Sequence, residues 1–167
     1  MNLSTEELER YERQLILKNW GEKQQLCLKK TSLAIPSSLK LAARYALAAG
    51  CGQVYLVGEI SKKDLLELKE LNPNSKVHST KNLSLNVDII INHQDSLSFS
   101  SRNNLFLEIS LDEGEKQIVS IKQSNPSFRI NTPEHITPSP KFLCLEIAQS
   151  IAVAIMLKWV KHCSDLS

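Results

Sequence analysis

The fold of this chain is decided by residues 31–39, which read Thr-Ser-Leu-Ala-Ile-Pro-Ser-Ser-Leu. The first five of these residues favour a short strand, and the strand breaks at Pro36. The following segment, residues 38–49, is rich in alanine and leucine, which predicts a helix that ends at Gly50. A strand that turns directly into a helix is the repeating unit of α/β domains with parallel sheets.

Strand and helix patterns alternate through the rest of the chain. The continuous apolar run at residues 87–91 is typical of a strand buried on both faces of a parallel sheet. Ser139 and Pro140 predict the start of a long apolar helix that ends near His162. The other expected strands are residues 53–57, 76–79, 104–109 and 117–121. A capping box of Ser4 and Glu7 predicts the start of a first helix, and further helices are expected at residues 22–29 and 61–71.

The predicted class is α/β: a Rossmann-like mixed sheet flanked by helices, with an N-terminal helical extension and a long buried C-terminal helix. A chain of 167 residues is expected to form a single domain of this kind. Within it, residues 1–30 form the N-terminal helical arm, 31–136 the α/β core and 137–163 the closing helix. The centre of the closing helix is apolar on all sides, so we expect it to be buried or to lie in a subunit interface.

The composition argues against several classes of protein. The net charge is +2 and the basic residues form no long run, so no nucleic-acid partner is expected. The longest apolar run, residues 151–157, is far shorter than the roughly 20 residues that span a bilayer, so no membrane partner is expected. The N-terminus has no secretory pattern and the four cysteines form no C-x-x-C pair, which favours a cytoplasmic protein with reduced thiols.

Five short motifs follow one another along the chain. They are Arg-Tyr-Glu-Arg-Gln at residues 10–14 with Trp20-Gly21-Glu22 and Gln25, Leu-Ala-Ala-Gly-Cys-Gly at 47–52, Leu-Asn-Pro at 71–73, Asp-Ile-Ile-Ile-Asn-His-Gln-Asp at 88–95, and the helical segment 137–159. In the same order they resemble the R-Y-x-R-Q…G…Q opening, the L-A-A-A-G-V-G and R-L-x-x-L-N-P segments, the strand ending in D-C-T-D-N and the closing helix of the ThiF/MoeB/HesA family. These proteins are the bacterial relatives of the ubiquitin-activating enzymes, and the resemblance covers most of the chain.

The resemblance implies an activity and a dimer. Members of the family bind ATP and Mg²⁺ and adenylate the C-terminal glycine carboxylate of a ubiquitin-like or sulfur-carrier protein. In their dimers, an arginine of the R-Y-x-R-Q helix reaches the ATP phosphates of the partner subunit. By position this arginine is Arg13, with Arg10 nearby. Ion pairs with Glu9 or Glu12 on the helix surface are the alternative role for these arginines, and both a homodimer and a heterodimer are open.

The turn after the first strand departs from the family pattern. A G-x-G-x-x-G turn brings backbone N–H groups close to a phosphate, because glycine has no Cβ. Here Pro36 has no N–H to donate, and Leu39 puts a bulky side chain where the backbone should approach. Ser37 and Ser38 are still able to hydrogen-bond a phosphate, and Lys40 is able to neutralise one. These three polar residues are the candidate phosphate ligands.

The other nucleotide-binding positions of the family are also altered. Glu59 lies one residue out of register with the acidic residue that contacts the ribose, and an exposed loop glutamate is the simpler interpretation. The segment that carries an arginine and a lysine in the family is shortened here to residues 60–64. Asp95 matches the aspartate that binds Mg²⁺, but Asn92 and Ser96 replace its neighbours. A turn residue after a strand is the simpler interpretation of Asp95.

These losses lead to one main hypothesis and two alternatives. Adenylation depends on cations and N–H groups around the phosphates, and each lost donor costs about 10²–10³ in rate. We therefore expect a ThiF-like pseudoenzyme without a cofactor of its own, which pairs with an active adenylating subunit and donates Arg13, with Arg10, to the partner's ATP and Mg²⁺ site. The first alternative is a divergent adenylyltransferase that binds Mg-ATP through the three turn residues and Asp95. The second is a binding module or homodimeric scaffold that holds a carrier-protein tail against the sheet.

Overall fold

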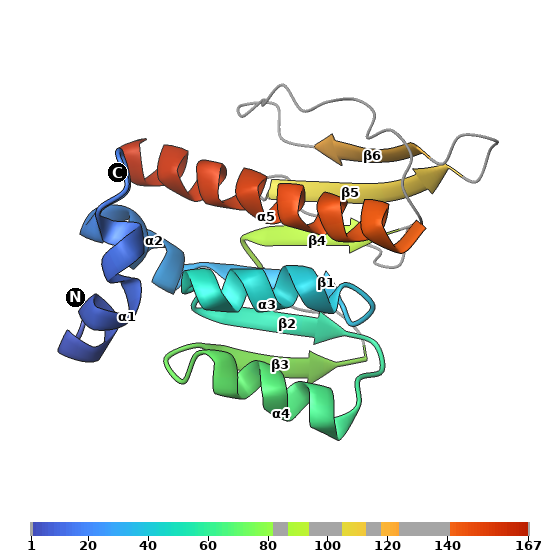
Figure 1. The fold of residues 1–167 in the computed structure, drawn as a ribbon, viewed down its shortest axis with the longest axis horizontal. Coiled ribbons are helices and arrows are strands. Elements are labelled where there is room, and N and C mark those ends of the chain that lie inside the picture. Colours follow the sequence, from blue (N-terminus) through green and yellow to red (C-terminus); the bar gives the residue numbers. More distant parts are fainter. Residues whose placement is uncertain (1, 82–86, 94–104, 113–117, 124–140, 167) are drawn as a thin grey trace.

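The computed structural model describes residues 2–81, 87–93, 105–112, 118–123 and 141–166 (Figure 1). Within these residues, six strands form one sheet in the order β3-β2-β1-β4-β5-β6. Strands β1 to β5 run parallel, and β6 runs antiparallel to β5. The structure therefore confirms the predicted α/β class with a mixed sheet. The strands are β1 (Ser32–Pro36), β2 (Gln53–Val57), β3 (Lys76–Thr80), β4 (Ile89–His93), β5 (Leu105–Asp112) and β6 (Ile118–Gln123).

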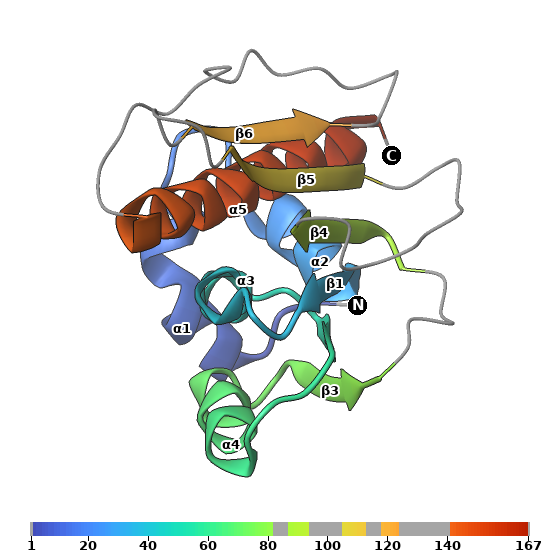
Figure 2. The ribbon, with the colours of Figure 1, turned by 90° about the vertical axis from the view of Figure 1, so that its right-hand side faces the viewer.

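Three helices cover one face of the sheet. Figures 1 and 2 show α3 (Lys40–Ala49), α4 (Lys62–Leu71) and α5 (Lys141–Leu166) side by side on the same side of the strands. The two N-terminal helices, α1 (Thr5–Leu15) and α2 (Glu22–Lys30), lie beside the amino ends of the strands in Figure 1. Among the helices of the described ranges, none is long and apolar enough to cross a membrane.

Several elements begin or end at other residues than expected. Helix α3 starts two residues late, because the Leu39 N–H donates to the Pro36 carbonyl oxygen at 2.9 Å and closes a turn ahead of the helix. Strand β4 also starts two residues late. Just before it, the carboxylate of Asp88 accepts hydrogen bonds from the N–H and Oγ of Ser32, at 2.8 and 2.6 Å. Helix α5 continues to Leu166, four residues past its predicted end, and its predicted N-cap lies outside the described residues.

The core lies between the sheet and its covering helices. Ala42, Ala43 and Ala46 of α3 are completely buried, and their small side chains let the helix backbone approach the strands. On the opposite face of the sheet, Ala34 and Ile90 are also completely buried, so the two central strands are covered on both faces. This agrees with the predicted parallel arrangement. The largest fully buried side chains are Leu28, Leu33, Ile35, Leu39, Leu47, Leu56, Ile89, Ile90, Ile91, Leu105, Leu107 and Ile109.

Candidate functional site

The loops at the carboxyl ends of β1, β2 and β3 are joined by backbone hydrogen bonds. The N–H of Ser37 donates to the carbonyl oxygen of Val57 at 2.8 Å, and the N–H of Gly58 donates to that of Thr80 at 2.9 Å. Gly58 has a φ of +107°, and a Cβ on it would lie 3.0 Å from the Ser37 Oγ. In nucleotide-binding sheets this edge receives the ligand. Here the N–H groups of Ser37 and Gly58 at this edge donate to carbonyl oxygens of the chain itself.

The turn between β1 and α3 is short and closed. Its hydrogen bond from the Leu39 N–H to Pro36 takes up one donor of the turn. The Leu39 side chain is completely buried and packs in the core. The sequence suggested that this side chain would block the approach of a phosphate, whereas the structure places it under the helix. Leu39 precedes the first residue of α3 and makes no side-chain cap.

A residue of α5 supplies the missing cap of α3. The Oε1 of Gln149 accepts a hydrogen bond from the Ala42 N–H at 3.1 Å. The Nε2 of the same side chain donates to the carbonyl oxygen of Leu145 at 3.3 Å, and Gln149 is only 4% exposed. Sequence reasoning missed this contact, because Gln149 and Ala42 are 107 residues apart and no local pattern relates them.

The candidate phosphate-neutralising residue Lys40 is engaged in an ion pair. Its Nζ lies 2.9 Å from Oδ1 of Asp64 in the first turn of α4. The same carboxylate accepts a hydrogen bond from the Ser61 Oγ at 2.8 Å. The hydrogen bonds from Lys40 and then Ser61 hold the pKa of Asp64 below its ordinary value. Farther along, Arg44 of α3 forms an ion pair with Glu67 of α4. These two ion pairs connect α3 with α4. They also leave the ammonium group of Lys40, the cation beside the turn, already paired.

The remaining candidate ligands do not complete a nucleotide site. Ser38 and Glu59 are exposed, and neither makes a hydrogen bond or ion pair with another described residue. Asp95 lies outside the described residues. Across the described part of the chain, no three His, Cys, Asp or Glu side chains are grouped to hold a metal ion. Among the candidate phosphate ligands, the Ser37 N–H and the Lys40 ammonium are therefore already bonded within the chain, whereas the Ser38 side chain is exposed.

The opposite end of α3 is built from the motif residues. The last carbonyl groups of a helix have no intrahelical partner. The Nδ2 of Asn72 donates to the Leu47 carbonyl oxygen at 2.9 Å and to the Tyr11 Oη at 2.7 Å. Gly50 ends the helix with a φ of +102°, and a Cβ there would lie 2.3 Å from the Nε2 of Gln25 and 2.8 Å from the Cζ of Tyr11. Burial raises the pKa of the Tyr11 hydroxyl.

Two glutamines cap the neighbouring carbonyls of α3. The Nε2 of Gln25 donates to the Ala49 carbonyl oxygen at 2.8 Å, and its Oε1 accepts from the Nε1 of Trp20 at 2.9 Å. The Nε2 of Gln14 donates to the Ala48 carbonyl oxygen at 3.4 Å. Three of the five motifs therefore meet here, and their side chains cap the last turn of α3. We call the side chains Tyr11, Gln14, Gln25 and Asn72 the α3 cap.

An ion pair joins the first two helices. Glu7 of α1 is buried, and its Oε1 lies 2.7 Å from the Nζ of Lys29 in α2. Its other oxygen accepts a hydrogen bond from the Ser4 N–H at 2.8 Å, as the predicted capping box requires. Burial alone raises the pKa of Glu7, but the hydrogen bonds from Lys29 and Ser4 outweigh it, so the pKa lies below its ordinary value. The ion pair therefore joins the first turn of α1 to the last turn of α2.

Arg10 and Arg13 lie at the far end of α3 from the turn. The Nη1 of Arg10 donates to the carbonyl oxygen of Leu71 at 3.2 Å. Arg13 is exposed, and its side chain makes no hydrogen bond or ion pair with another described residue. No ion pair to Glu9 or Glu12 is present within the described ranges. The ten residues of α3 separate this end from the turn by about 15 Å.

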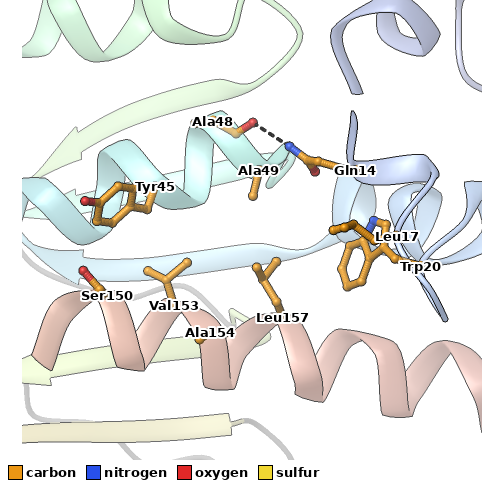
Figure 3. A pocket seen from close by; sticks show the side chains of 10 residues that line it. All are labelled: Gln14, Leu17, Trp20, Tyr45, Ala48, Ala49, Ser150, Val153, Ala154 and Leu157. Atoms are coloured by element: carbon orange, nitrogen blue, oxygen red, sulfur yellow. Dashed lines mark hydrogen bonds between the residues drawn. The ribbon is translucent and has the colours of Figure 1, made fainter. Parts of the chain in front are cut away.

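An apolar groove of about 510 Å³ opens between α1, α3 and α5 (Figure 3). The hydrogen bond from Gln14 to Ala48 crosses one end of it, as the dashed line in Figure 3 shows. Two of its large side chains are well exposed, Leu17 at 59% and Tyr45 at 45%. Its apolar lining includes Leu17, Trp20, Tyr45, Ala49, Val153 and Leu157.

No protein-family model matches this chain, and no curated protein matches its sequence. Solved structures do match. The chain shares the fold of MccB. The crystal structure of E. coli MccB with ATP has a TM-score of 0.66 to this chain at 14% identity, and the match covers 96% of this chain and 65% of the MccB chain. The crystal structure of PaaA has a TM-score of 0.63 at 15% identity, and covers 96% of this chain and 67% of PaaA.

The likeness to MccB also includes structures with a second molecule. The microcin C7 biosynthetic enzyme MccB in complex with N-formylated MccA has a TM-score of 0.59 at 12% identity. That match covers 84% of this chain and 60% of the MccB chain. This chain thus spans somewhat less than two thirds of the MccB chains that it matches. At such low sequence identity, the likeness shows a shared fold. The chemistry of this chain has to be argued from its own residues.

Proposed function

We propose that this chain is a ThiF-like protein that does not adenylate a substrate itself and instead pairs with an active adenylating subunit. In this proposal Arg13, with Arg10 beside it, serves the ATP and Mg²⁺ site of that subunit. The substrate of the pair is a carrier whose C-terminus is activated, either a ubiquitin-like or sulfur-carrier protein or a shorter peptide. The site of action is the cytoplasm.

The observation that carries the proposal is the contrast between the two ends of α3. At its first turn, three of the groups that would meet a phosphate are already bonded within the chain: the Ser37 N–H, the Lys40 ammonium and the Ala42 N–H. At its last turn, the motif side chains hold α1 against the domain and leave Arg13 exposed. About 15 Å of helix lies between them, too far for Arg13 to reach its own turn. An arginine in that position is suited to act on a neighbouring molecule.

The groove between α1, α3 and α5 supports the pairing. Leu17 lies four residues after Arg13, so a partner that covers this groove also comes within reach of the arginine. A desolvated apolar surface next to a charged side chain is a common arrangement in protein–protein interfaces. A homodimer through the same surface is an alternative within the proposal. In that case the Arg13 of each subunit would face the closed β1–α3 turn of the other.

The decisive experiment uses this chain together with a ThiF-like protein that has an intact glycine turn and is encoded in the same genome. Both proteins are co-expressed, and the mass of the complex is measured by native mass spectrometry. Adenylation is followed by ATP–pyrophosphate exchange with the carrier present. Arg13→Ala is expected to leave the complex intact and to lower exchange by about 10²–10³, the usual effect of losing one cation at the phosphates. Lys18→Ala, which removes another exposed cation close to α1, is the matched control.

An unchanged exchange rate with Arg13→Ala would contradict the donation of this arginine. Absence of any complex with the wild-type chain would contradict the pairing itself.

A second candidate function is a divergent adenylyltransferase, and the shared fold with ATP-bound MccB favours it. In that case Ser37, Ser38, Lys40 and Asp95 hold Mg-ATP, with Glu59 toward the ribose. Isothermal titration of the isolated chain with Mg-ATP separates the two candidates, because the second requires saturable binding. The third possibility, a scaffold for a carrier tail, predicts binding of the carrier without any nucleotide.

A further inference from the structure

We propose that Gln149 permanently occupies the anion position of the β1–α3 turn, so that the head of α3 is closed from within the chain and rejects nucleotide phosphate. The closing group is a neutral carboxamide contributed by α5. This inference goes beyond the pairing proposed above and does not depend on it, because a closed turn would be present equally in a chain that acts alone.

The bond takes up one of the donors that an anion at the start of α3 would use. The first turn of a helix carries N–H groups without intrahelical partners, and phosphates at α/β turns bind to these groups. In α3 the intrahelical bonds begin with the Ala43 N–H, which donates to the Leu39 carbonyl oxygen at 3.3 Å. Ala42 therefore has the last of the unpaired N–H groups, and its hydrogen bond to the Gln149 Oε1 measures 3.1 Å. Leu39 has no side-chain oxygen with which to make this bond itself.

The Gln149 side chain is held in place at both of its polar atoms. While its oxygen accepts from Ala42, its Nε2 donates to the Leu145 carbonyl oxygen one turn earlier in α5. The neighbouring Ala148 and Ala152 are completely buried and let α5 lie close against the core. A phosphate at this position would have to displace a buried carboxamide, which would then lose its partner in an apolar environment. Leaving such a group unpaired is costly.

The groups around this bond close the turn further. A phosphate would also need the Lys40 ammonium, which is paired with Asp64, and the Ser37 N–H, which is bonded to Val57. Each of these contacts is made between different elements of the fold. The turn is therefore better described as a structural joint between β1, α3, α4 and α5 than as an open cradle.

The first test measures the hydrogen bond itself. In the wild-type chain, amide hydrogen exchange followed by NMR should show a protected Ala42 N–H, although such a position in the first turn of a helix normally exchanges fast. Gln149→Leu keeps the approximate volume and removes the acceptor. We expect exchange at Ala42 to accelerate about tenfold or more, and the Tm to fall by about 3–8 °C. Ser150→Ala is the control, because its Oγ bonds only to the Glu146 carbonyl oxygen and the residue is exposed.

The second test adds anions to the wild-type chain, and it remains informative if Gln149→Leu does not fold. Mg-ATP and inorganic pyrophosphate are titrated to millimolar concentration while the amide resonances of residues 37–42 are followed. Unchanged resonances support the proposal, whatever happens elsewhere in the protein. Saturable shifts in this segment overturn it, as does a fast-exchanging Ala42 N–H in the wild-type chain or equal exchange in the wild-type and Gln149→Leu proteins.

Discussion

Replacing Gly50 by alanine should be among the most damaging single-methyl changes in this protein. The backbone of Gly50 has a φ of +102°, a conformation that costs an L-residue about 1–2 kcal/mol. The new Cβ would also lie 2.3 Å from the Gln25 Nε2 and 2.8 Å from the Tyr11 Cζ. Both side chains belong to the α3 cap, so neither can move without losing a hydrogen bond. Displacing packed groups of this kind costs about 1–3 kcal/mol more.

The expected loss for Gly50→Ala is therefore about 2–5 kcal/mol, a large part of the stability of a typical domain. Urea unfolding followed by circular dichroism measures it, and the midpoint should fall by about 1–2 M. Gly21→Ala is the matched control. Its Cβ would meet only the Gln24 Oε1, at 3.7 Å, so a loss under about 1 kcal/mol is expected there.

A second readout of Gly50→Ala reports on the cap directly. The Nε1 of Trp20 donates to the Gln25 Oε1, so a displaced Gln25 should change the fluorescence of Trp20 even while the chain is folded. A Trp159→Phe background isolates this signal, because the chain has two tryptophans. A destabilisation below about 1 kcal/mol, with unchanged Trp20 emission, would refute the reasoning that the side chains of the α3 cap lie too close to Gly50 for a Cβ to fit there.

Two further predictions concern titratable groups. The folded-state pKa of Glu7 lies below its ordinary value, so the stability from its pairing with Lys29 is present above the unfolded-state pKa and is lost as the pH falls through the folded-state pKa. Urea midpoints across the acidic range should show this loss in the wild type and less of it in Glu7→Gln, while Glu12→Gln retains it; identical profiles would argue against it. Burial raises the pKa of Cys51 to about 12, so iodoacetamide should leave Cys51 unmodified in the folded protein and label it in urea, whereas half-buried Cys163 reacts when folded. Labelling of native Cys51 as fast as Cys163, detected by mass spectrometry, would contradict this.

The sequence predicted the order and type of the elements because apolar periodicity is a local property. The capping box at Ser4 and the cap by Ser61 could be predicted for the same reason, since their partners lie three residues away. The start of β4 was less readable. Just before it, Asp88 bonds to Ser32, and these residues are 56 positions apart.

The candidate site was only partly predictable. The absence of glycine in the β1–α3 turn is plain in the sequence, but the groups that fill the turn are not, because Gln149 and Asp64 come from other helices. The motif resemblance directed attention to Arg13. It did not show that Tyr11, Gln14, Gln25 and Asn72 of the same motifs bond to one another or to the end of α3, because spacing along the chain does not state what a side chain contacts.

The α3 cap has a consequence for how the protein comes apart. The first residues of a chain usually fray and exchange their amide protons independently of the rest. Here Gln14 donates to the Ala48 carbonyl oxygen of α3, and Tyr11 accepts from Asn72, which also donates to the Leu47 carbonyl oxygen of α3. These bonds join the N-terminal helix to the last turn of α3. The amides of α1 should therefore exchange together with those of α3, as one cooperative unit. Helix α1 lies at the margin of the molecule in Figure 1, but we expect its free energy of opening to match that of α3.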